Sequence, residues 1–373
     1  MTALISTDAK PHRRLMPKAA ELARDPGVAL EVLRYWPNYA PTPLSPNATL
    51  AARCDIESLY IKNETGRMGL GSFKGLGGTY AVARSLMEAA GTALERPITA
   101  EDLTSSSLRR INRSTTFVCA SAGNHGLAVA AGAARYGARA VVYLNATVPE
   151  AFADRLRTLG AEVIRRGATY EQSVTAAAEA ATVGKAVLLA DTSWSGYWPL
   201  PRWVMTGYMV MMDEVRRQMP IAPTHVFLQA GVGGLAGSIA HAVRQVWGEK
   251  PCIVIVEPSA ARCLMESRRE GRPVVATGPQ STMARLDCKE PSLLALDILG
   301  RSANAYLDIE DADAGDAVAA LSTFGLNTTP SGAAGVAGLC RAAQDRDLRQ
   351  LLELSAHSRV LSFVTEFGPG VSI

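Results

Sequence analysis

Short runs of apolar, largely β-branched residues recur along the chain and alternate with longer alanine-rich stretches. The short runs predict strands at Leu59–Lys62, Thr116–Ala120, Ala140–Leu144, Ala161–Ile164, Val187–Ala190, His225–Gln229, Ile253–Glu257 and Val360–Thr365. The longer stretches predict helices that include Gly77–Ala90, His125–Tyr136, Pro149–Leu159, Tyr170–Ala181, Pro201–Gln218, Leu235–Val246 and Ala312–Thr323. This alternation favours an α/β protein whose mostly parallel, twisted sheets are flanked by helices.

The chain is 373 residues long, about twice the usual length of a single domain, so two domains are expected. We predict a large domain built from residues 1–88 and 221–373, with a smaller α/β domain, residues 89–220, inserted in it. In such sheets ligands bind at the carboxyl ends of strands, where loops lead into helix N-termini. A ligand at the interface of the two domains is therefore expected.

Composition narrows the class of protein. Hydrophobic residues make up 48% and charged residues 20%, and the net charge is only +3, so neither a nucleic acid nor an anionic membrane is expected as a partner. No apolar run reaches the roughly 18 residues that a membrane span needs. The first 25 residues carry charges and no apolar run, so no secretory signal is expected.

Cysteine and histidine usage points to a reducing compartment and no metal site. The six cysteines form no C-x-x-C pair, which indicates free thiols and a cytoplasmic protein. The five histidines are scattered along the chain, which argues against a metal centre.

Lys74 lies in the run GSFKGLGG, residues 71–78, just before a helix expected to begin near Gly77. Glycines allow a backbone and a bound molecule to approach closely. A lysine can form a Schiff base with an aldehyde, and burial lowers its pKa so that the free amine is available. The alternative is an ordinary loop lysine at a helix start.

Two polar turns follow predicted strands. The turn SAGNHG, residues 121–126, can hold a carboxylate through its backbone N–H groups, and Asn124 could bond a ring hydroxyl. His125 by itself is more typical of capping or packing than of catalysis. In the run DTSWSGY, Asp191 is a plausible ligand for a substrate cation, although an Asp that caps the following turn is the simpler interpretation.

A glycine-rich loop, GVGGLAG at residues 231–237, opens a predicted helix. Such loops bind phosphate through N–H groups and the helix dipole. The loop also satisfies G-x-G-x-x-A with Glu257 at the end of the next strand, so a dinucleotide, and with it an NAD-dependent oxidoreductase, is a second interpretation. A lysine loop, an Asn turn and a distant phosphate loop, in this order, suit a phosphorylated aldehyde cofactor better.

From residues 41–44 (PTPL) to Thr365, the chain resembles the fold-type II pyridoxal-phosphate enzymes, a superfamily typified by the tryptophan synthase β subunit. Within it the chain is most similar to the diaminopropionate ammonia-lyases. The narrower resemblance rests on residues 73–78 (FKGLGG), 191–197 (DTSWSGY), 223–233 (PTHVFLQAGVG), 256–258 (VEP) and 287–292 (DCKEPS).

The resemblance implies roles for individual residues. Lys74 would carry pyridoxal phosphate as a Schiff base and remove the substrate's α-proton, and Asp191 would hold its side-chain amine. The other implied cofactor contacts are Phe73, Asn124, Thr365 at the pyridine nitrogen, and the phosphate-binding amides of Gly231, Val232, Gly233, Gly234 and Leu235. The implied substrate contacts are Ser121, Ala122, Gly123, His125 and Asp191.

Three positions depart from the ammonia-lyase pattern. Ala122 stands where those enzymes have an Asp that serves the D-isomer, so the opposite face of the cofactor is expected to lack a base. Pro330 stands where they have Glu, and Phe367 is added after Thr365-Glu366. The last two put the substrate's identity in doubt.

The expected activity is elimination of ammonia from an L-amino acid with an amino-bearing β-carbon, to give a 2-keto acid, in a small-molecule enzyme that is a homodimer by analogy. A serine or threonine dehydratase, another β-lyase or a β-replacement enzyme is the nearest alternative. A catalytically silent relative that binds pyridoxal phosphate is a further one.

Overall fold

The computed structural model describes residues 3–10, 14–121, 123–168 and 170–368. The strands are β1 Ala3–Ile5, β2 Leu44–Pro46, β3 Ser58–Asn63, β4 Thr116–Ala120, β5 Arg139–Leu144, β6 Glu162–Arg165, β7 Val187–Leu188, β8 His225–Gln229, β9 Cys252–Pro258, β10 Ala305–Ile309 and β11 Arg359–Val364. The longer helices are α3 Lys74–Leu94, α6 Asn124–Tyr136, α7 Glu150–Thr158, α8 Tyr170–Val183, α9 Pro199–Tyr208, α10 Val210–Gln218, α11 Gly234–Trp247, α12 Cys263–Glu270, α13 Leu293–Ser302, α14 Asp311–Ser322 and α15 Pro330–Gln344. The shorter ones are α1 Leu30–Leu33, α2 Ala48–Arg53, α4 Ala100–Thr104, α5 Ser106–Asn112, α16 Arg346–Leu351 and the 3-10 turns η1 Ser6–Asp8, η2 Lys18–Ala20 and η3 Arg67–Gly69.

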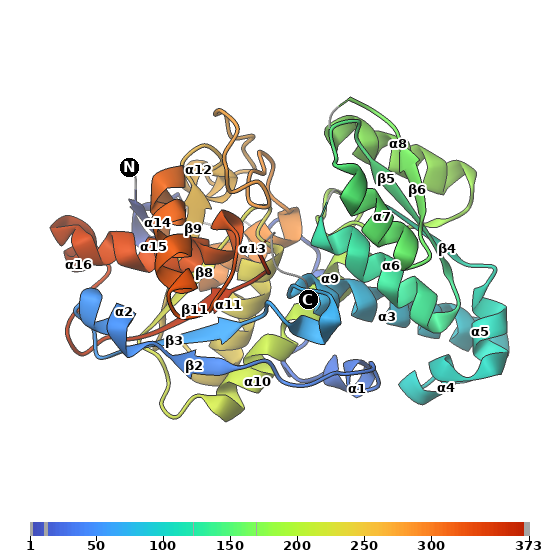
Figure 1. Ribbon diagram of the computed structural model, residues 1–373, viewed down its shortest axis with the longest axis horizontal. Helices are drawn as coiled ribbons and strands as arrows, with labels where there is room; N and C mark the ends of the chain where they lie inside the picture. Colours follow the sequence, from blue (N-terminus) through green and yellow to red (C-terminus); the bar gives the residue numbers. More distant parts are fainter. Residues whose placement is uncertain (1–2, 11–13, 122, 169, 369–373) are drawn as a thin grey trace.

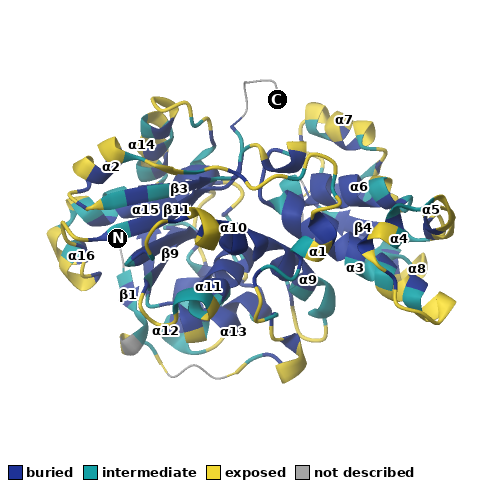
Figure 2. Cartoon of the chain, turned by 90° about the horizontal axis from the view of Figure 1, so that it is seen from below, coloured by how far each residue is buried: buried dark blue, intermediate teal, exposed yellow. Residues whose placement is uncertain are grey.

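The strands form two sheets, one in each lobe of the molecule (Figure 1). The larger has the order β1-β10-β9-β8-β11-β3-β2, and only its edge strands β1 and β2 run antiparallel to their neighbours. The smaller sheet has the order β6-β5-β4-β7 and is entirely parallel. Helices cover both, and buried residues fill the centre of each lobe while α5 and α16 are largely exposed (Figure 2). The α/β class is thereby confirmed.

The predicted strands all appear, with ends that shift by at most two residues. Strand β10 was not predicted, because Asp308 interrupts its apolar pattern; in the structure this residue is buried and pairs with Arg262 at 2.9 Å. The single helix predicted over residues 201–218 is two consecutive helices that meet at Met209. The two domain ranges stay a prediction.

Helix α3 begins at Lys74 and not near Gly77, so the glycines of this run belong to its first turns. An added Cβ at Gly77 would lie 2.3 Å from Cε1 of Tyr208, and one at Gly78 would lie 2.6 Å from Cβ of Ala128. These glycines therefore allow helices α9 and α6 to pack closely against α3. The sequence had suggested a different role, namely close approach of a bound molecule.

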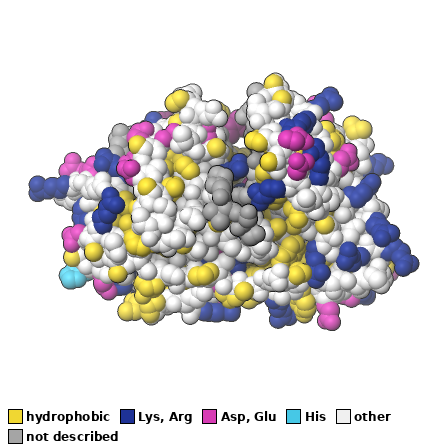
Figure 3. All heavy atoms as spheres, viewed as in Figure 1, with side chains coloured by type: hydrophobic (Ala, Val, Ile, Leu, Met, Phe, Trp, Pro, Cys, Tyr) yellow, Lys and Arg dark blue, Asp and Glu magenta, His cyan; other side chains and the backbone are white. Residues whose placement is uncertain are grey.

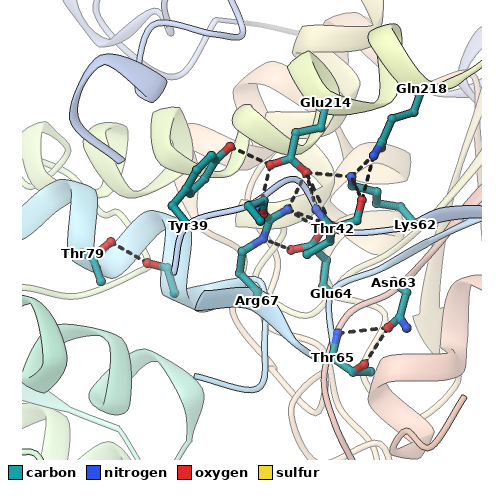
Figure 4. Close-up of polar contacts among 12 residues, drawn as sticks. Tyr39, Thr42, Lys62, Asn63, Glu64, Thr65, Arg67, Thr79, Glu214 and Gln218 are labelled. Atoms are coloured by element: carbon teal, nitrogen blue, oxygen red, sulfur yellow. Dashed lines mark hydrogen bonds and ion pairs between the residues drawn. The ribbon is translucent and has the colours of Figure 1, made fainter. Parts of the chain in front are cut away.

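A buried charge network lies beneath the segment that leads to Lys74 (Figure 4). Arg67 and Lys62 are 0% exposed, and they pair with the carboxylates of Glu64 and Glu214 at 2.7 Å. Thr42 donates to Glu64 at 2.6 Å. Two cations and two carboxylates balance one another, so the β3–η3 connection is fixed to helix α10 without an unpaired buried charge.

The surface carries no dominant charge on the face seen in Figure 3, where acidic and basic side chains both occur over each lobe. Within the part of the chain that the structure describes, no helix has the length and apolar character that crossing a membrane requires.

Candidate active site

The predicted site residues converge where strand ends of both sheets face one another. Lys74 follows β3 through η3, and Asp191 follows β7 of the smaller sheet. The Nζ of Lys74 forms a short ion pair with Oδ2 of Asp191, and their side chains are 24% and 21% exposed. Two segments 117 residues apart in the sequence thus place an amine and a carboxylate together in a largely enclosed site.

The ion pair sets the charge state of both groups. Burial alone would lower the pKa of Lys74, but the Asp191 carboxylate and the Tyr208 phenol beside it raise that pKa well above its ordinary value. Burial opposes ionisation of Asp191 too, yet the Lys74 ammonium holds its pKa well below the usual range. The expectation that burial lowers the pKa of Lys74 is therefore wrong in this state, because Asp191 outweighs the desolvation.

Hydrogen bonds and aromatic stacking fix the segment around Asp191. Tyr197 donates its hydroxyl to the Leu188 carbonyl at 2.7 Å and accepts from the Ala190 amide, while its ring stacks on Trp194 at 4.2 Å. Ser193 bonds Ser292 at 2.8 Å. These contacts hold Asp191 at the end of its strand by backbone and aromatic packing, so a capping role for its carboxylate is not needed.

The glycine-rich loop lies next to Asp191. Gly233 has φ +99°, a conformation that favours glycine, and it precedes the first turn of α11. An added Cβ at Gly231 would lie 2.9 Å from Sγ of Cys288, and one at Gly234 would lie 3.6 Å from the Asp191 carbonyl oxygen. The Val232 carbonyl accepts the Ser292 amide at 3.0 Å. The loop is thus fixed at a helix N-terminus, with Leu235 inside the helix, where an anion binds well.

The Asn turn meets the last strand. Nδ2 of Asn124 donates to Oε2 of Glu366 at 2.5 Å, and the Phe73 amide donates to the Thr365 carbonyl at 3.1 Å. The hydroxyl of buried Thr365 accepts from Nε2 of Gln229 at 3.4 Å. Glu366 therefore ties the Asn turn to the segment after the last strand, and Thr365 ties the residue before Lys74 to the same segment. The contact of Glu366 with Asn124 was not predicted from the sequence.

The remaining turn residues serve the turn itself. The hydroxyl of Ser121 accepts the amides of Gly123 at 3.3 Å and Gly126 at 3.0 Å. His125 is buried, and its Nε2 lies 2.9 Å from the Leu189 carbonyl oxygen, as a packing histidine would. Its direct contact with substrate stays a prediction. Ala122 lies outside the described residues.

Pro330 has a clear structural place. It occupies the first turn of α15, where the Thr329 side chain accepts the Gly332 amide at 3.0 Å. Proline is favoured there because its missing N–H is not needed and its φ suits a helix. The hydroxyl of Thr329 also donates to Oε1 of Glu366 at 2.5 Å, so this helix start borders the Asn124 side of the site.

Tyr208 is a site residue that sequence reasoning missed. Its ring packs edge-on against Phe73 at 4.8 Å between centroids, and the Nζ of Lys74 lies 5.7 Å from its centroid. Its hydroxyl is buried and has no hydrogen-bond partner among the residues that the structure describes. Tyr208 stands in the apolar helix predicted over residues 201–218, where nothing in the local sequence distinguishes it from a core residue. An unpartnered hydroxyl beside a lysine and a glycine loop suits a phosphorylated aldehyde, so the residues fit pyridoxal phosphate.

The position of Glu257 contradicts the dinucleotide interpretation. Its carboxyl group is 0% exposed and accepts the amides of Leu264 and Met265 at 2.8 Å each. Burial raises its pKa to about 8. A ribose-binding acid would have to face a ligand, whereas this one caps helix α12 from inside the protein.

Comparisons with known proteins agree with this geometry. The chain matches the family described as pyridoxal-phosphate dependent enzymes over residues 35–366. It is 36% identical over 348 residues to the diaminopropionate ammonia-lyase of Salmonella typhimurium, covering 88% of this chain and 86% of that one. It is 35% identical over 278 residues to the Escherichia coli K12 enzyme, covering 73% and 69%.

Solved structures of the Escherichia coli enzyme have the same fold. Its complex with D-serine superposes with a TM-score of 0.87 and 29% identity, over 98% of this chain and 93% of that chain. Its complex with an aminoacrylate-pyridoxal phosphate azomethine reaction intermediate gives a TM-score of 0.85 with the same coverage. The chain therefore belongs to the family of pyridoxal-phosphate dependent enzymes, with the two-domain fold of type II.

Proposed function

We propose that this protein is an ammonia-lyase that removes the β-amino group of L-2,3-diaminopropionate and yields pyruvate and ammonia. The observation that carries the proposal is the ion pair between Lys74 and Asp191, because it places a base and an ammonium-binding carboxylate in one site. The similarity to diaminopropionate ammonia-lyases over most of the chain supports it.

The roles of the residues follow from their charges. Pyridoxal phosphate, when bound through Lys74, supplies the electron sink that makes the α-proton acidic. The ε-amine of Lys74 would remove that proton as a general base. Thr365 at the ring nitrogen and Asn124 at the phenolic oxygen would orient the cofactor.

Asp191 accounts for the preference for a diamino acid. The carboxylate of Asp191 stays ionised because the Lys74 ammonium lies beside it. When Lys74 becomes neutral, the carboxylate is left without this cation. The β-ammonium of the substrate restores the balance through a charge-assisted hydrogen bond. The β-nitrogen must depart as ammonia from its protonated form, since amide ion is a very poor leaving group.

The decisive experiment is a product assay on the purified protein. Each molecule of L-2,3-diaminopropionate should yield one pyruvate and two ammonia, one from the β-carbon and one from hydrolysis of the α-imine, at a kcat/KM well above those for L-serine and L-threonine. A higher kcat/KM for serine or threonine would make the protein a dehydratase. Trapping of an added thiol or amine nucleophile on the β-carbon would make it a β-replacement enzyme, and the absence of any keto acid would leave a silent relative.

Replacing Asp191 with asparagine should lower kcat/KM for L-2,3-diaminopropionate by about 10- to 100-fold more than for L-serine, because only the diamino acid carries the cation that the carboxylate binds. The ratio of the two kcat/KM values measures this. Asp55→Asn is the matched control. Asp55 is exposed, lies outside the site and pairs with Arg349 at an N–O distance of 3.3 Å. Equal losses on both substrates would remove the substrate role of Asp191.

Turnover should be specific for the L-enantiomer, because Ala122 carries no group that can remove a proton from the opposite face. We expect L-2,3-diaminopropionate to exceed its D-isomer in kcat/KM by about 100-fold or more, in keeping with the contribution of a general base. The variant Ala122→Asp should raise activity on the D-isomer. Comparable rates for both enantiomers in the native protein would contradict the assignment.

Three further features belong to the proposal: the cellular location, the oligomeric state and the domain borders. The six cysteines are free thiols in the structure, which supports a cytoplasmic location. We also propose a homodimer, by analogy with this fold, and the domain ranges given above. Size-exclusion chromatography with light scattering measures the oligomeric state. Limited proteolysis tests the domain borders near residues 88 and 220.

A further inference from the structure

The segment of residues 283–289 spans the two anion-binding parts of the site. On one side, Cα of Leu286 and the carbonyl oxygen of Arg285 lie 3.1 and 3.2 Å from an ideal Cβ at Gly231, where the glycine-rich loop begins. On the other, the Arg285 side chain lies against Gly123 in the Asn turn. The segment therefore places one cationic side chain over the space between the two.

The guanidinium of Arg285 lies directly on the turn. Its Nε, Cζ and Nη1 atoms are each 3.3 Å from an ideal Cβ at Gly123, so a flat group covers the glycine face. The backbone of Arg285 is fixed by its amide, which donates to the hydroxyl of Ser331 at 3.0 Å. The backbone of Arg285 is thus fixed, and a side chain at position 123 would crowd its guanidinium.

The Arg285 side chain is partly exposed beside the Asn turn. Nε of Arg285 lies 3.9 Å from Oε2 of Glu366, at the outer limit of an ion pair, and the Arg285 side chain is 46% exposed. Glu366 makes closer contacts, at 2.5 Å, with Asn124 and Thr329. A guanidinium presents several donors in a rigid fork that matches a carboxylate.

We propose that Arg285 binds the α-carboxylate of the substrate from above the Asn turn and so helps to set specificity for α-amino acids. This inference rests on the proposed function, and it completes a charge match: the β-ammonium meets Asp191 while the α-carboxylate meets Arg285. An amino acid held at both ends presents its Cα to Lys74 between them. Arg285 is a binding residue and takes no part in proton transfer.

The test compares Arg285→Ala with the native holoenzyme on L-2,3-diaminopropionate and on its α-carboxamide. The variant should raise KM for the acid about 10- to 100-fold with kcat changed less than about 3-fold, as expected for loss of a charge-assisted contact. On the carboxamide, the native protein and the variant should have the same KM. Arg285→Lys should recover part of the affinity. Arg269→Ala, which removes a similarly exposed arginine paired with Glu266 on α12, is the control.

A binding measurement separates this inference from the proposed function. Titration with L-alanine, followed by the change of the visible absorption band, should show weaker binding to Arg285→Ala than to the native protein, even if diaminopropionate is not the natural substrate. An unchanged KM and unchanged alanine affinity would overturn the inference. Equal losses on the acid and the carboxamide would overturn it too, since they would assign Arg285 a structural role. If Arg285→Ala fails to retain cofactor, Arg285→Gln serves for the same comparison.

Discussion

Replacing Lys74 with alanine should abolish the visible absorption band of the purified protein and lower lyase activity by about 10³-fold or more. Lys74 is the amine at the start of α3 that lies beside Asp191 and Tyr208. The same nitrogen would hold the cofactor and then act as the base. One substitution therefore removes both functions.

Several measurements make this prediction sharp. The absorption spectrum and the intact mass after borohydride reduction should show cofactor joined to the native chain and none joined to Lys74→Ala. Added methylamine should restore part of the activity, because a free amine can occupy the vacated space. The variant Lys250→Ala, at an exposed position, should behave as the native protein. A reduced adduct on Lys74→Ala would show that another lysine carries the cofactor.

Replacing Glu214 with glutamine should lower the free energy of unfolding by about 3–5 kcal/mol, the usual cost of removing one partner from a buried ion pair. Glu214 is 3% exposed and accepts from Arg67 through both carboxylate oxygens at 2.7 Å. It also pairs with Lys62 and accepts from the Tyr39 hydroxyl, each at 2.7 Å. An amide in its place leaves two buried cations facing the single carboxylate of Glu64.

Urea unfolding of the holoenzyme, followed by circular dichroism, measures the change. Glu88→Gln is the matched control, because Glu88 is 57% exposed and lies 3.6 Å from Arg84; its loss should cost less than about 1 kcal/mol. A change of similar size in both variants would mean that the network of Figure 4 is hydrated and contributes little.

The sequence by itself determined the fold class and the segments of the site. Apolar runs of strand length between alanine-rich stretches predict parallel sheets, because period and length are local properties of the chain. Lys74, Asn124, Asp191 and the glycines from 231 were recognised for a similar reason, since each stands in a short run of unusual composition; the last three runs follow predicted strands, and the run of Lys74 leads into a predicted helix.

Only the tertiary structure decided how these segments meet. Glycines 77 and 78 look like a ligand loop in the sequence, but they lie in helix α3, where Tyr208 and Ala128 from other helices occupy the space that a side chain would need. The pKa of Lys74 depends on a carboxylate 117 residues away, and electrostatic interactions follow distance in space and not separation along the chain. Arg285 and Glu366 reach the Asn turn for the same reason: residues far apart in the sequence become neighbours when the chain folds, and no local pattern records that.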